Sequence, residues 1–240
     1  MIVEVCANSL ESAMNAQKAR ADRIELCMEL GVGGITPSWG LLKQVRQAIS
    51  IPVHVLVRPR SGDFTYSPHE FEIMLQDVSL CVELGFDGVV SGVLNRDLTI
   101  DRDRTQELIR TARGRSFTFH RAFDWVPDPF LALNILQDMG VGTILSSGQR
   151  PKAEEGLPLL SLLRQRAVDC TIMPGAGIGP HNVALFKDDG FKAVHLSATK
   201  FVGNLPMVPK LSMNTPSFLR EDAVAISQID IVEAVRGLVK

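Results

Sequence analysis

The stretch Glu83-Leu-Gly-Phe-Asp-Gly88 decides the fold, because it ends a helical pattern at Gly85 and then begins a β-branched run. Gly directly after a helix is the usual left-handed cap. The same joint recurs as Asp138-Met-Gly-Val-Gly142 and as Asp188-Asp-Gly-Phe-Lys192. The capping glycines are 55 and 50 positions apart, which is close to two strand–helix units each time. The chain is therefore expected to repeat one βα unit.

The alternation of strand and helix patterns extends along the whole chain. β-branched runs predict strands near 2–6, 23–27, 53–58, 87–91, 116–121, 142–146, 171–175 and 192–197. Helical periodicity predicts helices near 9–19, 38–49, 68–84, 102–112, 129–139, 155–167, 180–187 and 222–238. Eight units without a break in composition predict one (β/α)8 TIM-type barrel domain over 1–240. Prolines interrupt 198–221, which is predicted to be a long irregular segment before the last helix.

Charge and composition exclude several classes of partner. The 25 Lys and Arg against 27 Asp and Glu leave a net charge of −2, so no basic field favours nucleic acid or anionic lipid. No window approaches the roughly 20 apolar residues of a membrane span, and the amino terminus does not resemble a signal peptide. We expect a cytoplasmic protein without nucleic-acid or membrane partners. In that compartment Cys6, Cys27, Cys81 and Cys170 are expected to act as thiols, not as a disulfide framework.

Strand parity predicts which side chains point into the barrel. The apolar set of each strand should face the helices, and the alternate set should face inward. The inward set includes Cys6, Arg23, Cys27 and Ser197, with Arg60 at a strand exit and Asp124 in a loop. Near the carboxyl ends of the strands it places Glu4, Glu25, Arg58, His120 and His195. Barrel enzymes build their sites at this face. Buried charges are costly unless they are paired, so the cluster favours a functional site, and a structural salt-bridge layer is the alternative.

Two glycine-containing loops suggest an anion site. Ser147-Gly148 follows the sixth predicted strand, and Gly175-Ala-Gly177 follows the seventh. Glycines in these loops let backbone N–H groups approach a phosphate or another anion. Any short loop from a strand to a helix uses glycines of this kind, so an ordinary turn is the alternative.

The inward charges support an enzyme hypothesis. A general acid and base with a proton partner and an anion-binding arginine would suit acid/base chemistry on a small anionic or sugar-like molecule. The predicted catalytic residues are Glu4, Glu25, Arg58, His120 and Asp124, and the predicted substrate-binding residues are Arg60, Ser147, Gly148, Gly175, Gly177, His195 and Ser197. No strand carries a lysine in its carboxyl half, which argues against a Schiff-base aldolase. No GxSxG or GxGxxG element follows a strand, so no organic cofactor is expected.

Several motifs resemble the CutC copper homeostasis family. They are Glu4-x-Cys6, Asp22-Arg-Ile-Glu-Leu-Cys27, Val57-Arg-Pro-Arg60, Gly62-Asp-Phe64, His120-Arg-Ala-Phe-Asp124 and Val194-His-x-Ser197. The resemblance covers residues 2–200 and thins at Met213-Asn-Thr-Pro216. It implies a cytoplasmic TIM-type barrel, often a homodimer, that is associated with copper homeostasis and binds Cu(I) through Cys6 and Cys27.

The chemistry of the residues agrees with that implication but leaves alternatives. Soft thiolates select Cu(I), and two cysteines on adjacent strand ends can hold a two-coordinate ion. There are two alternatives to copper binding for Cys6 and Cys27: they pack together as two buried thiols, or they form a disulfide bond. Copper binding alone leaves Glu4, Arg58 and His120 without a purpose, so a copper ion and a small organic molecule both remain candidate ligands.

Overall fold

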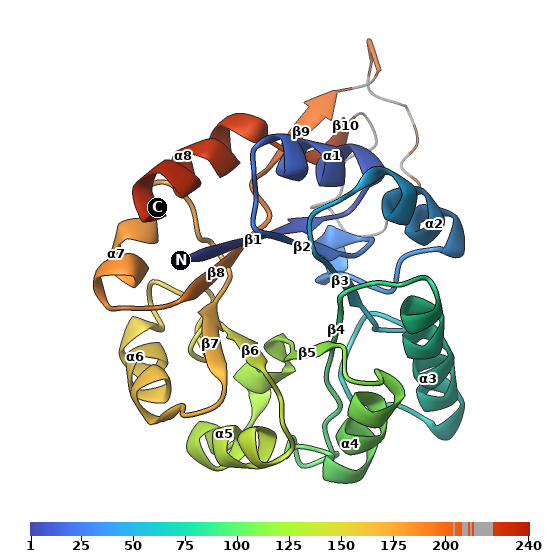
Figure 1. The fold of residues 1–240 in the computed structure, drawn as a ribbon, viewed down its shortest axis with the longest axis vertical. Helices are drawn as coiled ribbons and strands as arrows, with labels where there is room; N and C mark the ends of the chain where they lie inside the picture. Colours follow the sequence, from blue (N-terminus) through green and yellow to red (C-terminus); the bar gives the residue numbers. More distant parts are fainter. Residues whose placement is uncertain (204, 208–210, 212, 214–222) are drawn as a thin grey trace.

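The computed structural model describes residues 1–203, 205–207, 211, 213 and 223–240. Eight parallel strands form a nearly closed barrel with helices around it, which confirms the predicted TIM-type fold (Figure 1). The strands are β1 (Ile2–Ala7), β2 (Arg23–Leu26), β3 (Val53–Leu56), β4 (Gly88–Ser91), β5 (Ser116–Phe119), β6 (Thr143–Ser146), β7 (Thr171–Pro174) and β8 (Ala193–Leu196). Their order in the sheet follows the chain, with β8 next to β1.

Over the described residues, eight helices form the outer ring, and the last of them begins later than predicted. They are α1 (Leu10–Lys18), α2 (Trp39–Ala48), α3 (Pro68–Glu83), α4 (Arg102–Thr111), α5 (Pro129–Asp138), α6 (Leu157–Arg166), α7 (Val183–Asp188) and α8 (Ile229–Val239). Two short 3-10 helices, η1 (Leu30–Val32) and η2 (Arg121–Trp125), lie in loops. Gly85, Gly140 and Gly190 have φ of +78°, +80° and +93°, as expected for left-handed caps. Among the described residues, every helix is too short or too polar to cross a lipid bilayer.

The main core lies between the strands and the helices. Val3 and Val5 of β1 and Ile24 and Leu26 of β2 have no exposed surface and face this layer. The alternate residues of the same strands therefore point into the barrel, as parity predicts. A small cluster of Cys6, Cys27, Leu56 and Val90 packs inside the barrel.

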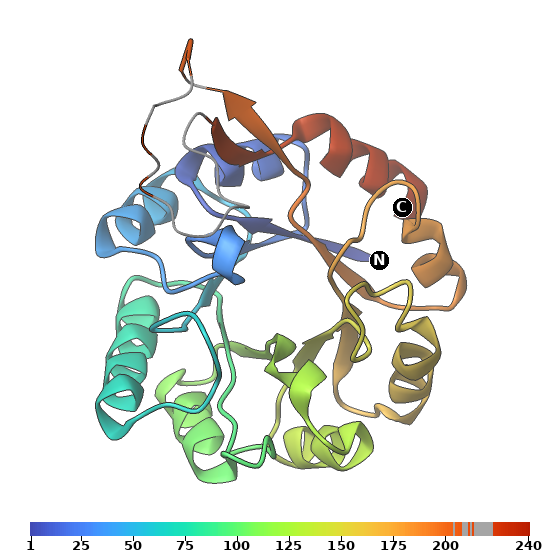
Figure 2. The same cartoon turned by 180° about the vertical axis from the view of Figure 1, so that it is seen from behind.

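An antiparallel hairpin stands where part of the last helix and of the irregular segment was predicted. β9 (Thr199–Gly203) pairs with β10 (Ala223–Ser227), and α8 begins only at Ile229. The hairpin projects from the barrel beside α1 (Figure 2). Ile226 fits the helical spacing of α8, but it lies opposite Lys200 in the hairpin. Much of the rest of 198–221 (204, 208–210, 212 and 214–221) lies outside the described residues.

The register of β1 against its neighbours β2 and β8 determines which side chains meet inside the barrel. Glu4 lies opposite Arg23 of β2 on one side and His195 of β8 on the other, and Cys6 lies opposite Glu25. The barrel shear thus offsets β2 by two residues from the alignment that would place Glu4 beside Glu25. In the described part of the chain no hydrogen-bonded ladder joins the neighbouring strands β7 and β8, and we call this boundary the β7–β8 seam.

Candidate functional site

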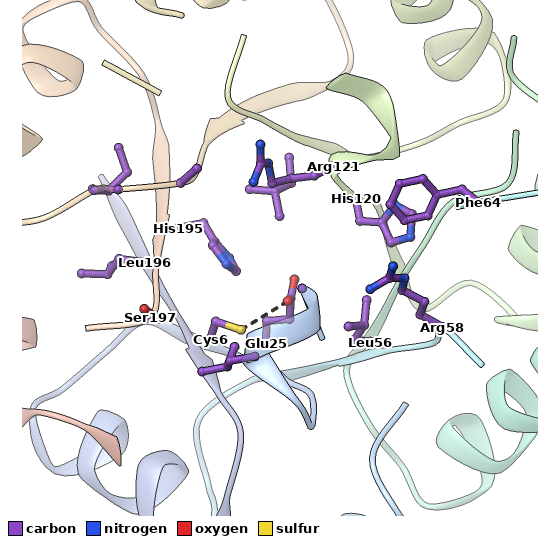
Figure 3. Close-up of a pocket in the computed structure, with 16 residues that line it drawn as sticks. Cys6, Glu25, Leu56, Arg58, Phe64, His120, Arg121, His195, Leu196 and Ser197 are labelled. Atoms are coloured by element: carbon purple, nitrogen blue, oxygen red, sulfur yellow. Dashed lines mark hydrogen bonds between the residues drawn. The ribbon is translucent and has the colours of Figure 1, made fainter. Parts of the chain in front are cut away.

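A cavity of about 350 Å³ opens inside the barrel at the carboxyl ends of the strands (Figure 3). Seven of the residues predicted from the sequence line it: Cys6, Glu25, Arg58, His120, Gly177, His195 and Ser197. The cavity also has an apolar wall made by Leu30, Leu56, Leu145, Ile178 and Leu196. The structure therefore brings a large part of the predicted set to one place.

The two predicted copper ligands touch each other. The Sγ atoms of Cys6 and Cys27 are 3.5 Å apart, and the Cys6 thiol also lies 3.6 Å from Oε1 of Glu25. Both cysteines are free, because a disulfide bond would hold the sulfur atoms about 2.05 Å apart. Cys6 lines the cavity, whereas Cys27 has no exposed surface and lies behind it.

The loop that contains Gly34 covers Cys27. A Cβ atom at position 34 would lie 3.4 Å from Cβ of Cys27 and 2.6 Å from Cδ2 of Leu56. Gly34 has φ of +85°, so glycine also suits its backbone conformation. Cys27 is consequently reached from the cavity only past Cys6 and its neighbours.

A charged layer lies beneath the thiols. Oε1 of Glu4 is 2.8 Å from Nδ1 of His195, and its other oxygen accepts a hydrogen bond from Nε of Arg23. Burial by itself would raise the pKa of Glu4, but the hydrogen bond with His195 and the charge of Arg23 outweigh it and lower the pKa to about 2. Burial opposes the charge of His195, yet the charge of Glu25 and hydrogen bonds to Cys6 and Glu4 raise its pKa well above the ordinary value. Glu4 is therefore ionised at neutral pH, and its surroundings favour the charged form of His195.

Glu25 and Cys6 stand at the boundary between this layer and the cavity. Burial, reinforced by the charge of Glu4, raises the pKa of the Glu25 carboxyl, and its Oε2 has no hydrogen-bond partner. The hydrogen bond with Cys27 and burial raise the pKa of the Cys6 thiol well above its ordinary value. One ligand atom each from Cys6, Glu25 and His195 lies within 4.8 Å of the others, so the three groups can share one metal ion.

His120 forms the opposite side of the cavity (Figure 3). Its Nδ1 accepts a hydrogen bond from the backbone N–H of Ala122 at 3.3 Å, and its Nε2 is buried without a partner. Burial and the charge of Arg58 lower the pKa of His120 to about 3, so the ring is neutral. Since Nδ1 is the acceptor, the proton of the neutral ring lies on Nε2.

The predicted arginines act mainly on loops. Arg58 reaches the cavity, but its guanidinium donates to the carbonyl oxygens of Val32, Gly34 and Gly62 at 2.8 Å each. Arg60 lies outside the cavity and pairs with Glu70 at 2.6 Å and with Asp63 at 3.3 Å. Arg58 therefore braces the loops that cover Cys27, and Arg60 is tied to the start of α3.

Asp124, Ser147 and Gly148 also lie outside the cavity. The Asp124 carboxylate accepts hydrogen bonds from Ser146, from Ser147 and from Arg121, so it organises the loop after β6. Gly148 packs against Gly156, where a Cβ atom would lie 2.3 Å from the carbonyl oxygen. Gly175 does not line the cavity, but the space beside it is filled by Leu145 and His195.

Two further cavity residues, Phe64 and Arg121, were not placed in the site by sequence reasoning. The ring of Phe64 packs on His120 with centroids 4.8 Å apart, and its loop folds back over the barrel mouth. Arg121 follows His120 directly and pairs with Asp124 at 2.8 Å. Strand parity could not find either residue, because both lie in loops.

Comparisons with known proteins agree with the geometry. The family model described as CutC family matches residues 1–200. A family protein CutC of Enterobacter sp. (strain 638) is 42% identical over 224 residues, which cover 93% of this chain and 89% of that protein. A family protein CutC of Salmonella typhimurium is 46% identical over 197 residues, or 82% of this chain and 79% of that protein.

Solved structures extend the comparison. The putative copper homeostasis protein CutC from Streptococcus agalactiae superposes with a TM-score of 0.79 at 32% identity, over 82% of this chain and 98% of that one. Thiamine phosphate pyrophosphorylase from Pyrococcus furiosus gives a TM-score of 0.61 at 14% identity, over 99% of this chain and 94% of that one. The second likeness shows the shared fold alone.

Proposed function

This chain belongs to the CutC family, and on that premise we propose that it binds Cu(I) between the thiolates of Cys6 and Cys27 at the mouth of the barrel. The observation that carries the proposal is the 3.5 Å separation of the two sulfur atoms. Thiolates select Cu(I), and imidazole is also a good copper ligand. The relative from Streptococcus agalactiae is named a putative copper homeostasis protein.

Two further groups could help to hold the ion. One ligand atom each of His195 and Glu25 lies within 4.8 Å of the Cys6 sulfur, so either side chain would be close enough to supply a third ligand beside the two thiolates. Imidazole is itself a suitable copper ligand.

Copper must displace protons from this site. The Cys6 thiol has a pKa raised well above its usual range, and His195 is held in its protonated form. Metal ligands have to be deprotonated, so the affinity for Cu(I) rises with pH. Glu4 and Glu25 lie next to His195 and favour its protonated form, so a metal held by His195 would have to displace that proton.

Replacement of each cysteine by serine tests the proposal. Cu(I) binding is measured under reducing conditions by competition with a chromogenic chelator. Cys6→Ser and Cys27→Ser should each weaken binding at least about 100-fold, because a hydroxyl is a hard ligand. Cys81→Ser is the matched control, since Cys81 is buried in the outer core and should leave the affinity unchanged.

The thermal unfolding temperature of each variant separates a lost ligand from a lost fold. Wild-type affinity in the Cys6→Ser, Cys27→Ser double variant would refute the proposal. Cu(I) binding by free thiols also requires a reducing compartment, so we extend the proposal to a cytoplasmic location.

A copper site at the thiols uses one side of the cavity. It involves Cys6, Cys27, Glu25 and His195. It does not explain why the buried Nε2 atom of His120, on the other side, lacks a hydrogen-bond partner. Acid/base catalysis, the alternative function, would need an organic ligand that reaches that side.

A further inference from the structure

Part of the cavity lining carries hydrogen-bond donors that have no acceptor among the described residues. We call this part, which comprises Arg121, Ala176, Gly177 and Ile178, the donor side. We propose that this donor side binds a small organic anion, a carboxylate or phosphate that also carries a hydroxyl or carbonyl oxygen. The anionic group would contact Arg121 and the backbone N–H groups of Ala176, Gly177 and Ile178. The second oxygen would accept a hydrogen bond from Nε2–H of His120.

His120 supplies the most specific observation. It is 6% exposed, lines the cavity, and has no partner at Nε2. Because the N–H of Ala122 occupies Nδ1, the neutral ring keeps one N–H donor, at the buried Nε2 atom of this cavity-lining residue. A ligand oxygen would reach it by displacing the ring of Phe64, which packs on His120. Leaving such a donor unpaired costs stability, and an oxygen atom of a ligand would satisfy it.

The ring of His120 is held in place for this role. It packs against Phe64 on one side and against Gly92 on the other. A Cβ atom at position 92 would lie 2.7 Å from Nδ1 of His120, so only glycine leaves room for the ring. A donor with a fixed orientation binds its acceptor at a lower entropic cost.

The loop after β7 (Thr171–Pro174) supplies backbone donors. Ala176 and Gly177 have φ of +84° and +72°, a conformation that L side chains rarely adopt. Within the described part of the chain, the N–H groups of Ala176, Gly177 and Ile178 donate to no acceptor. Successive free N–H groups form anion-binding concavities, and TIM barrels often bind phosphate after their seventh and eighth strands.

The charges on the lining also favour an anion. Arg121 is anchored through Nε to Asp124 at 2.8 Å and through Nη2 to Ser147 at 2.8 Å, while Nη1 has no acceptor among the described residues. Glu25 is the one acidic residue of the cavity lining, and it lies beside Cys6 on the thiol side. The cavity volume of about 350 Å³ is near the lower limit for ligand pockets, which indicates a small molecule.

Isothermal titration of the chelator-treated full chain tests the inference, which does not rest on copper binding. The probes are two pairs: acetate and glycolate for carboxylates, and inorganic phosphate and glycerol 3-phosphate for phosphates. In one pair the hydroxylated anion should bind saturably and about tenfold more tightly than the simple anion, as one added hydrogen bond predicts. The pair that does so identifies the source of the anionic group.

Variants assign the binding to the donor side. Arg121→Gln should reduce binding of every anion, whereas Arg115→Gln removes an exposed charge elsewhere and should not. His120→Phe keeps a ring against Phe64 but should abolish the advantage of the hydroxylated anion. Gly92→Ala should do the same by displacing the ring, and Gly142→Ala is its control, because a Cβ atom there would meet only a carbonyl oxygen at 3.9 Å.

Three results would overturn the inference: no saturable binding of any probe by the wild type, no advantage for either hydroxylated anion, or wild-type binding by both His120→Phe and Arg121→Gln. The Cys6→Ser, Cys27→Ser double variant should retain anion binding. Loss of copper binding without loss of anion binding therefore separates the two proposals.

Discussion

Glu4 shows how a single carboxylate can organise the floor of a binding site. It has no exposed surface, and its two oxygens bind His195 and Arg23. A buried carboxylate is tolerated only when it is paired in this way. Glu4 therefore holds His195 in the orientation in which the ring faces the thiols.

Substitution of Glu4 should be costly for stability. Glu4→Gln leaves the buried charges of Arg23 and His195 without their partner, so the free energy of unfolding should fall by about 3 to 5 kcal/mol. Urea denaturation at neutral pH measures the change. Glu11→Gln, on the exposed face of α1, is the control and should change stability by less than about 0.5 kcal/mol. A Glu4→Gln protein as stable as the control would show that the pair contributes little.

The buried histidines predict sensitivity to acid. Burial and the charge of Arg23 lower the pKa of His54 to about 4, below the ordinary value of 6.5. Between these values the unfolded chain binds a proton that the folded protein excludes, so stability falls as the pH decreases from about 6.5 to 4. His54→Gln should flatten this part of the profile, measured by denaturation at several pH values. His120 contributes in the same direction.

Strand parity predicted which side chains point into the barrel, but it did not predict which of them contact each other. It placed Glu4, Cys6, Glu25 and Cys27 on the inward faces, and the structure has them there. It could not give their partners, because pairing depends on register between strands. The two-residue offset of β2 puts Arg23, not Glu25, opposite Glu4.

Arg60 contacts the first turn of α3, and this contact explains its role in the structure. Ser67 and Glu70 form a capping box at the start of α3, and Arg60 binds Glu70 from outside. Arg60 was predicted to bind substrate because it lies at a strand exit, but that position does not determine where its long side chain ends.

Two substitutions separate these roles. Ser67→Ala should lower the free energy of unfolding by about 1 kcal/mol, because a backbone N–H of the first turn loses its acceptor. Arg60→Gln should lower it by less than about 1 kcal/mol, as expected for a partly exposed ion pair. Both variants should bind Cu(I) as the wild type does in the chelator competition. Weakened copper binding in Arg60→Gln would contradict the placement of Arg60 outside the site.

Gly88 of β4 makes room for the ring of His54. A Cβ atom at Gly88 would lie 2.6 Å from Cδ2 of His54. Gly88→Ala should therefore lower the free energy of unfolding by about 1 to 3 kcal/mol through overpacking. Gly142→Ala has space for its methyl group and should cost much less in the same denaturation assay. Equal losses in the two variants would show that His54 moves aside freely.

The hairpin of β9 and β10 could not be predicted from local sequence patterns. Ile226 and α8 share an apolar spacing of three to four residues, which predicted one helix from 222 onward. β10 forms instead because it pairs with β9, whose residues lie 20 to 28 positions earlier in the chain. A contact of that range leaves no periodic signal in either segment.

For the whole molecule, the sequence was sufficient to predict the eight-stranded barrel. Eight βα units with repeated glycine joints allow few other architectures. The cavity could be predicted only in part, since its walls include loop residues such as Phe64 and Arg121. Their positions follow from long-range packing of loops over the mouth. That the whole chain forms one domain stays a prediction.

The β7–β8 seam has a consequence for how the two ligands would influence each other. The backbone donors lie just after β7, and His195 belongs to β8. The organic anion and the copper ion would therefore bind on opposite sides of the β7–β8 seam. A ring that lacks backbone hydrogen bonds at one boundary opens there most easily. Binding of one ligand should thus change the affinity of the protein for the other ligand, and the factor is the same in both directions. Repeating the Cu(I) competition with and without a saturating anion measures that factor, and a value of one would mean that the seam is rigid.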